Sequence, residues 1–235
     1  MIVISNPTAI ANEINTIHAL FENGLELLHI RKPDFSETEM KTFVSKIKTT
    51  FRHRLVLHSH HQLALEFGIN RIHFTEKNRV ATSEEHLKKW KEKKFSLSTS
   101  IHQMSDFEEL SSVFDYAFFG PVFESISKPN YVSNLDFKKE LEQRKNNKTA
   151  LIALGGITSE NIKTALAFGF DDVALLGSIW NNNHSIENFK PKKGAEFYRM
   201  HLFTQDFGDT LADILRNTKK EQHKNRFQYG ELYQR

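Results

Sequence analysis

The chain lacks cysteine entirely and also lacks long apolar runs. With no cysteine among its 235 residues, neither a disulfide nor a thiolate metal site can form. No run of eighteen apolar residues is present, which argues against a membrane-spanning helix. The opening residues MIVIS are too short for the apolar core of a secretory signal and carry no basic segment. We therefore expect a cytoplasmic protein with no membrane partner.

The chain also has no large excess of positive or negative charge. The 32 Lys and Arg residues nearly balance the 29 Asp and Glu residues, leaving a net charge of +3. A nucleic-acid-binding domain usually carries a stronger or more clustered basic patch. The densest basic cluster, between Lys88 and Lys94, is typical of a solvated helix face. We therefore expect no nucleic-acid partner.

Short apolar segments alternate with amphipathic ones along most of the chain. Segments such as 150–154 and 173–176 are apolar throughout, as in parallel strands that are buried on both faces. Ser36 and Glu39 form a capping-box pattern before a helical repeat. Strands are expected at 2–5, 25–31, 55–58, 72–74, 95–101, 116–119, 150–154 and 173–176. Their spacing of roughly 20–25 residues predicts parallel strands joined by helices.

This pattern predicts an α/β fold, a single (β/α)8 TIM barrel over residues 1–190. A helical or irregular C-terminal extension follows over residues 191–235. Barrels of this class have about 250 residues. An open, doubly wound sheet is the alternative, but no Gly-x-Gly-x-x-Gly follows the first strand, as a dinucleotide-binding sheet would require.

Glycine turns follow the last two expected strands. Gly155 and Gly156 precede Ser159, a candidate helix cap, and Gly177 and Ser178 follow the eighth strand. Loops after strands 7 and 8 are the recurrent phosphate site of this barrel, and amide groups at a helix start favour anions. The alternative is two tight turns that need a positive φ. We predict a phosphorylated small-molecule ligand at this end of the barrel.

Other polar side chains are expected at the same rim. Ser125, Ser127 and Lys128 lie in a long loop after the sixth strand and could hold a second anion, although such a sequence is often a plain surface loop. Arg31 ends the second strand and could bind phosphate in a bidentate manner or form a surface ion pair.

Histidines also occur at the strand ends. His58 and His60 would point to the same side if their strand continued, but no third ligand at a metal-site spacing is evident. A neutral, hydrogen-bonding role is favoured over metal binding for both. His102 could act as a general acid or base or make an ordinary polar contact.

In this order and spacing, several segments resemble the family of thiamine phosphate synthase and the thiazole tautomerase TenI. The resemblance covers about residues 2–180. The segments that carry it are Phe119-Gly120-Pro121-Val122-Phe123, Ser125-x-Ser127-Lys128, Ala153-Leu154-Gly155-Gly156-Ile157, Val173-Ala174-Leu175-Leu176-Gly177-Ser178, Ser100-x-His102 and Ile72-His73.

The resemblance implies a transferase that joins a thiazole phosphate to a pyrimidine-methyl diphosphate and releases diphosphate. The thiazole phosphate would be bound by Gly155, Gly156, Gly177 and Ser178. The diphosphate would be bound by Arg31, Ser125, Ser127 and Lys128, with help from Ser100. Lys32, His58 and His60 are further substrate-binding candidates, and Ser100, His102 and Lys128 are the expected catalytic residues.

The sequence also departs from this family pattern. The second basic position after strand 2 is Pro33, with Lys32 displaced by one. Magnesium is expected for the synthase reaction, but Ser59 and Asn78 stand where the family has its metal carboxylates, so no metal site is predicted. No other cofactor is predicted.

The tautomerase branch needs no magnesium, but Pro121 occupies the position of its catalytic histidine. A metal-independent tautomerase and a non-catalytic binder of thiamine or thiazole phosphate therefore stay as alternatives. The resemblance suggests a homodimer, although the sequence identifies no interface.

Overall fold

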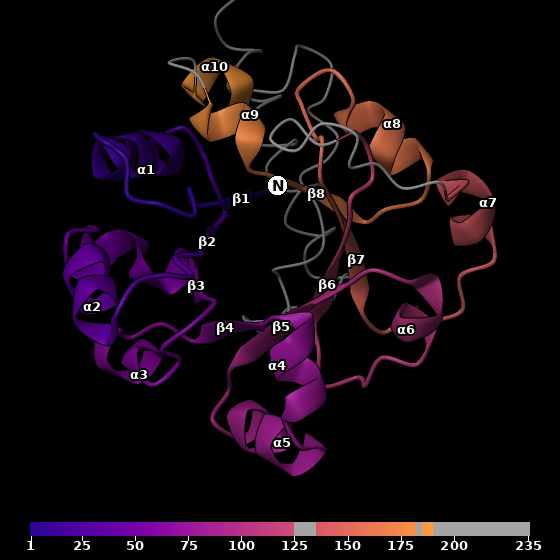
Figure 1. Cartoon of the computed structure of the whole chain (residues 1–235), viewed down its shortest axis with the longest axis horizontal. Helices are drawn as coiled ribbons and strands as arrows, with labels where there is room; N and C mark the ends of the chain where they lie inside the picture. The colour runs from indigo at the N-terminus through magenta and orange to yellow at the C-terminus, as the bar shows by residue number, and fades with distance from the viewer. Residues whose placement is uncertain (125–134, 182–184, 190–235) are drawn as a thin grey trace, which may run out of the picture. The chain divides into compact units, whose positions relative to one another are not determined.

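The computed structural model describes residues 1–124, 135–181 and 185–189, which form a closed barrel of eight parallel strands (Figure 1). Each strand pairs with its neighbours in chain order, and the first closes onto the eighth. The strands are β1 (Ile2–Ile4), β2 (Leu27–Ile30), β3 (Leu55–Leu57), β4 (Arg71–Phe74), β5 (Ser96–Ile101), β6 (Tyr116–Phe119), β7 (Ala150–Leu154) and β8 (Asp172–Leu175). The predicted TIM barrel is confirmed, and the open sheet is excluded.

Helices lie outside the ring of strands (Figure 1). They are α1 (Glu13–Glu22), α2 (Glu37–Ser45), the 3-10 helix η1 (Thr49–Arg54), α3 (Leu63–Phe67), α4 (Glu76–Ala81), α5 (Glu84–Glu92), α6 (Met104–Glu108), α7 (Phe137–Glu142), α8 (Ile162–Ala167), α9 (Gly177–Trp180) and α10 (Ser185–Phe189). None of these helices is long and apolar enough to cross a bilayer. The expected extension over 191–235 lies outside the described residues and stays a prediction.

Local sequence signals explain some helix ends and fail at others. The capping box is present, since the Ser36 side chain accepts from the Glu39 N–H and the Glu39 carboxylate accepts from the Ser36 N–H. Ser159 is not a cap, because α8 begins at Ile162 after Asn161. The helices η1 and α4 were not predicted; neither buries a residue, so neither has an apolar repeat that the sequence could show.

Alternate residues of each strand face two different environments. On β2, Leu28 and Ile30 belong to the apolar cluster that also contains helix residues such as Leu20 and Met40. Because side chains alternate along a strand, the intervening His29 points into the barrel interior. This residue is fully buried. The interior of the barrel is therefore polar on this side, while the layer between strands and helices is apolar.

A buried ion pair fixes the end of β2 to the start of α1. The Lys32 Nζ lies 2.6 Å from the Glu13 carboxylate and donates to the Thr8 carbonyl at 2.8 Å. Both side chains are almost completely buried, and the ring of Phe43 lies 4.9 Å from the Lys32 ammonium. The expectation that Lys32 binds substrate phosphate is contradicted, because its ammonium is enclosed and already neutralised by a carboxylate.

Replacing Glu13 with Gln should destabilise the protein by about 3–5 kcal/mol, because it leaves the Lys32 ammonium buried without a counter-charge. Urea denaturation of the wild type and the variant measures this loss. The double variant Glu13→Gln/Lys32→Met should recover most of the stability. Equal stabilities of wild type and Glu13→Gln would show that the pair contributes nothing.

Candidate active site at the barrel mouth

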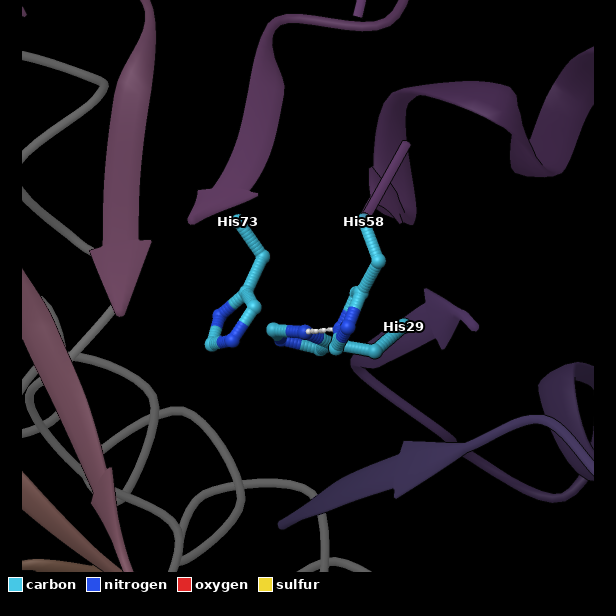
Figure 2. A group of neighbouring side chains, drawn as sticks. All are labelled: His29, His58 and His73. Atoms are coloured by element: carbon cyan, nitrogen blue, oxygen red, sulfur yellow. Dashed lines mark hydrogen bonds between the residues drawn. The ribbon is translucent and has the colours of Figure 1, made fainter. Parts of the chain in front are cut away.

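Three histidines from neighbouring strands meet inside the barrel. His29 lies on β2, His58 directly follows β3 and His73 lies on β4. Figure 2 shows the three rings converging on one point, with His58 and His73 side by side. The rings of His58 and His73 stack with centroids 4.0 Å apart, and all three residues are buried. The spacing of residues 29, 58 and 73 along the chain gives no hint of this cluster, because strand pairing creates it.

Hydroxyl groups form hydrogen bonds with two of these rings, those of His29 and His73. The His29 Nδ1 and the His58 Nε2 are 2.9 Å apart, and the His29 Nε2 lies 2.7 Å from the Tyr116 hydroxyl. The two ring nitrogens of His73 lie 2.9 Å from the Ser98 hydroxyl and 3.0 Å from the Ser100 hydroxyl. A neutral imidazole has one N–H and one acceptor nitrogen, so hydroxyls that can donate or accept suit either tautomer.

Burial keeps the three imidazoles neutral. It lowers the pKa of His29 and His58 well below the usual range, and neighbouring histidines lower both further. Burial lowers the pKa of His73 to about 3, with additional contributions from the positive charges of His61 and Arg31. Burial also raises the pKa of the Tyr116 hydroxyl. The cluster therefore stays uncharged at neutral pH and can exchange protons along hydrogen bonds without holding a net charge.

His58 and His60 do not act as a pair. The strand β3 ends at Leu57, and His60 adopts a positive φ of 52°. The His60 Nε2 bonds the carbonyl of Phe35 at 2.8 Å, whereas His58 points into the barrel. The condition for the two side chains to point to the same side is not met, because the strand ends at Leu57.

Ser100 and His102 also separate. The Ser100 hydroxyl bonds His73 inside the barrel, as described above. His102 follows the end of β5, is half exposed, and bonds the Gly120 carbonyl through Nδ1 at 2.8 Å. Its Nε2 lies 3.9 Å from the Glu76 carboxylate. The structure thus joins Ser100 to the histidine cluster and places His102 at the rim.

The glycines after β7 are required by local packing. Gly155 and Gly156 have φ values of +95° and +66°. A Cβ on Gly155 would lie 2.7 Å from the Pro121 Cα, and one on Gly156 would lie 2.4 Å from the Glu124 carbonyl oxygen. Only glycine combines these angles with such close contacts. The tight-turn explanation therefore accounts for both residues, and the anion-binding role of this turn stays a prediction.

The turn after β8 carries a stronger indication of a ligand. Because β7 and β8 pair in parallel with Leu154 opposite Ala174, the two glycine turns leave the barrel at the same end. Gly177 and Ser178 begin α9, and Leu176 provides no side-chain cap for the first N–H groups. The Ser178 hydroxyl is buried and has no hydrogen-bond partner among the described residues. Buried hydroxyls without a partner are rare, so this one is suited to a ligand oxygen.

Arg31 provides a positive charge at the same rim. It directly follows β2, is partly buried, and its guanidinium forms no hydrogen bond or ion pair within the described ranges. Its charge contributes to the lowered pKa of both His58 and His73. The other predicted anion ligands, Ser125, Ser127 and Lys128, lie outside the described residues.

Comparison with known proteins gives the family. A model described as thiamine monophosphate synthase matches residues 1–179. The chain belongs to this family. The thiamine-phosphate synthase of Listeria welshimeri is 30% identical over 149 residues, which cover 60% of this chain and 68% of the relative. That of Rhizobium etli is 25% identical over 183 residues, covering 74% and 86%. The solved thiamine phosphate pyrophosphorylase of Bacteroides thetaiotaomicron superposes with a TM-score of 0.67 and 27% identity, covering 86% of this chain and 99% of that one.

The magnesium expected for a synthase of this family does not fit the residues present. The Ser59 hydroxyl is buried and has no hydrogen-bond partner in the part of the chain that the structure describes. Asn78 is exposed on α4 beside an outer hollow lined by His86 and Trp90. Both side chains are neutral, and Mg²⁺ prefers carboxylate and phosphate oxygens in octahedral geometry. Ser59 and Asn78 are therefore poor replacements for a pair of carboxylates, and we derive no step through magnesium.

Sequence reasoning missed His29, His73, Ser98 and Tyr116 as site residues, although His73 lies in a segment that carries the family resemblance. A weak signal was available, because a histidine at position 29 interrupts the otherwise apolar strand Leu27–Ile30. The sequence could not show whether that side chain faces the barrel interior or the helices, since a shift of one residue in register exchanges the two.

Lowering the pH below about 6.5 should reduce the stability of the protein. The folded state keeps His29, His58 and His73 neutral, with the pKa of His73 at about 3, whereas the unfolded chain binds protons near pH 6.5. The unfolded state therefore holds more protons between these values, and each histidine costs up to about 1.4 kcal/mol for every pH unit of acidification.

Urea denaturation in metal-free buffer between pH 7.5 and pH 5 measures this loss. A His73→Gln variant should lose less stability on acidification than the wild type, since it lacks one of the titrating rings. Identical pH dependences would contradict the assignment of a buried neutral imidazole at His73.

Proposed function

We propose that this protein acts in thiamine biosynthesis as a transferase of the thiamine-phosphate synthase type. Its substrates would be hydroxyethylthiazole phosphate and hydroxymethylpyrimidine diphosphate. A C–N bond forms between the thiazole nitrogen and the pyrimidine methylene carbon, and the bond from that carbon to the diphosphate oxygen breaks, so that diphosphate leaves with the electron pair. The family match over residues 1–179 carries this proposal.

Two groups at the mouth of the barrel are suited to the two anions. The Ser178 hydroxyl, which has no partner among the described residues, and the first amides of α9 are suited to the thiazole phosphate. Two strands further round the ring, the guanidinium of Arg31 after β2 is suited to the leaving diphosphate, since bidentate hydrogen bonds from arginine to phosphate are strong. The two anions would thus bind at separate points of the same rim.

The histidine cluster supports a second candidate, a metal-independent tautomerase acting on a thiazole carboxylate phosphate. Tyr116, His29 and His58 form a chain of short hydrogen bonds whose proton directions can reverse together. Such a chain could accept a proton at one place and return it at another, as a tautomerase requires. The neutral residues Ser59 and Asn78 at the metal positions also favour this reaction. A binder without activity is the third alternative.

An assay with both substrates separates these three functions. Purified protein is incubated with thiazole phosphate and pyrimidine diphosphate, in magnesium or in EDTA, and thiamine phosphate and diphosphate are quantified. A parallel incubation with the thiazole carboxylate phosphate alone follows its tautomer interconversion. We expect both products in equal amounts, and only when both substrates are present. Tautomer interconversion that is unaffected by EDTA, with no diphosphate release, would replace the synthase by the tautomerase. Tight thiamine phosphate binding with neither activity would leave a binder.

Replacing Ser178 with Ala should weaken thiazole phosphate binding without destabilising the fold. A hydrogen bond to a charged group contributes about 1.5–3 kcal/mol, so KM or Kd for this substrate should rise at least about tenfold. The folded protein loses no hydrogen bond, because the hydroxyl has no partner within the described part of the chain.

Ser185 provides a matched control for this variant. Its hydroxyl donates to the Ile179 carbonyl at 2.7 Å, so Ser185→Ala should lower stability and leave KM unchanged. If Ser178→Ala left substrate affinity unchanged, the phosphate site would have to lie elsewhere.

A further inference from the structure

We propose that His29, His58 and His73 form a three-histidine site for a divalent transition metal ion, with zinc as the best match. These rings come from β2, the end of β3 and β4, and their ligand nitrogens all lie within 4.8 Å of one another (Figure 2). This site is separate from the carboxylate positions at which the family resemblance places magnesium, and it does not depend on the proposed function.

The nitrogen distances need modest change to accommodate an ion, and two of the rings must also turn. Zinc binds imidazole nitrogen at 2.0–2.1 Å, so two tetrahedral ligands lie about 3.3 Å apart. The His29 Nδ1 and the His58 Nε2 are 2.9 Å apart and face one another. Changes of about 1.5 Å or less in the distances between the ligand nitrogens would give tetrahedral spacing. The stacked rings of His58 and His73, whose planes differ by 22°, must also rotate so that a nitrogen of each faces the ion. Metal binding would replace the shared proton between His29 and His58.

Two of the three rings, those of His29 and His73, already have supporting partners. The His29 Nε2 bonds the Tyr116 hydroxyl, and His73 bonds Ser98 through Nδ1 and Ser100 through Nε2, so one hydroxyl stays in place whichever nitrogen binds the ion. Histidines that bind metals almost always place their other ring nitrogen on such a partner, which fixes the tautomer and the ring orientation. Hydrogen bonding alone would not require ring nitrogens from three histidines to lie this close together.

The chemistry of the ligands selects the kind of ion. Imidazole suits zinc, copper, nickel and iron, whereas magnesium and calcium prefer oxygen. Three protein ligands leave one tetrahedral position for water or a substrate atom, as in catalytic rather than structural zinc sites.

One charge opposes this site. Arg31 lies near enough to lower the pKa of His58 and His73, so its guanidinium repels a dication there. An anion between Arg31 and the ion would remove that repulsion. Metal binding should therefore be measured with and without inorganic diphosphate, which is expected to tighten it.

Cobalt and zinc titrations of the full chain test the proposal directly. The protein is stripped with a chelator and titrated with Co²⁺, which gives visible d–d absorption when nitrogen ligands hold it in four- or five-coordinate geometry. We expect one equivalent to bind, one equivalent of Zn²⁺ to remove the absorption, and Zn²⁺ to raise the Tm of the wild type. An absence of saturable binding in the presence and absence of diphosphate would overturn the proposal.

Two variants and a control locate the site. His58→Gln retains a polar group near Nε2 but removes a ligand and should abolish the cobalt spectrum. Tyr116→Phe keeps the ligands and should weaken affinity roughly 10- to 100-fold through the loss of its bond to His29. His61→Gln alters a nearby histidine that bonds the His73 carbonyl and should leave the spectrum unchanged. Circular dichroism checks folding. Binding that is equal in wild type and both test variants would place the ion elsewhere and reject the site.

Discussion

Closure of the parallel barrel is the constraint on which the rest of this structure depends. Once β1 pairs with β8, alternate residues of every strand must face a small enclosed interior, and the others must face the helices. This closure brings His29, His58 and His73 together from three strands. It also directs the turns after β7 and β8 and the residue after β2 to the same rim. A site with polar groups at its base and anion ligands around its mouth follows from that single geometry.

Burying three imidazoles inside the barrel costs free energy, and the hydroxyl groups around them offset part of this cost. Three imidazoles in an enclosed space cannot carry charge without a large desolvation penalty, which is why each has a lowered pKa. Tyr116, Ser98 and Ser100 supply the hydrogen bonds that make the neutral rings acceptable there. The same neutrality leaves nitrogen lone pairs available, whether for a proton relay or for a metal ion. The electrostatic character of this interior therefore differs from that of a carboxylate-lined magnesium site.

Arg31 and Lys32 are adjacent basic residues, but they differ in burial and therefore in role. Lys32 turns back toward α1 and is neutralised by Glu13, so it serves stability. Arg31 stays at the rim, and its guanidinium has no counter-ion within the described ranges. Two adjacent basic residues were both reasonable phosphate ligands, but the direction of each side chain at the strand end leaves only Arg31 suited to that role.

The sequence by itself determined the eight-stranded barrel, most strand positions to within one or two residues, and the family, because apolar alternation and glycine-bearing turns are local patterns. It also indicated Ser178 and Arg31 as rim residues, since both directly follow recognisable strands. Only the tertiary structure decided that Lys32 is enclosed, that His60 departs from His58, and that His29 and His73 complete a cluster. These outcomes depend on strand register and on where each strand stops. A change of one residue in either reverses the direction of a side chain while leaving the sequence pattern almost unchanged.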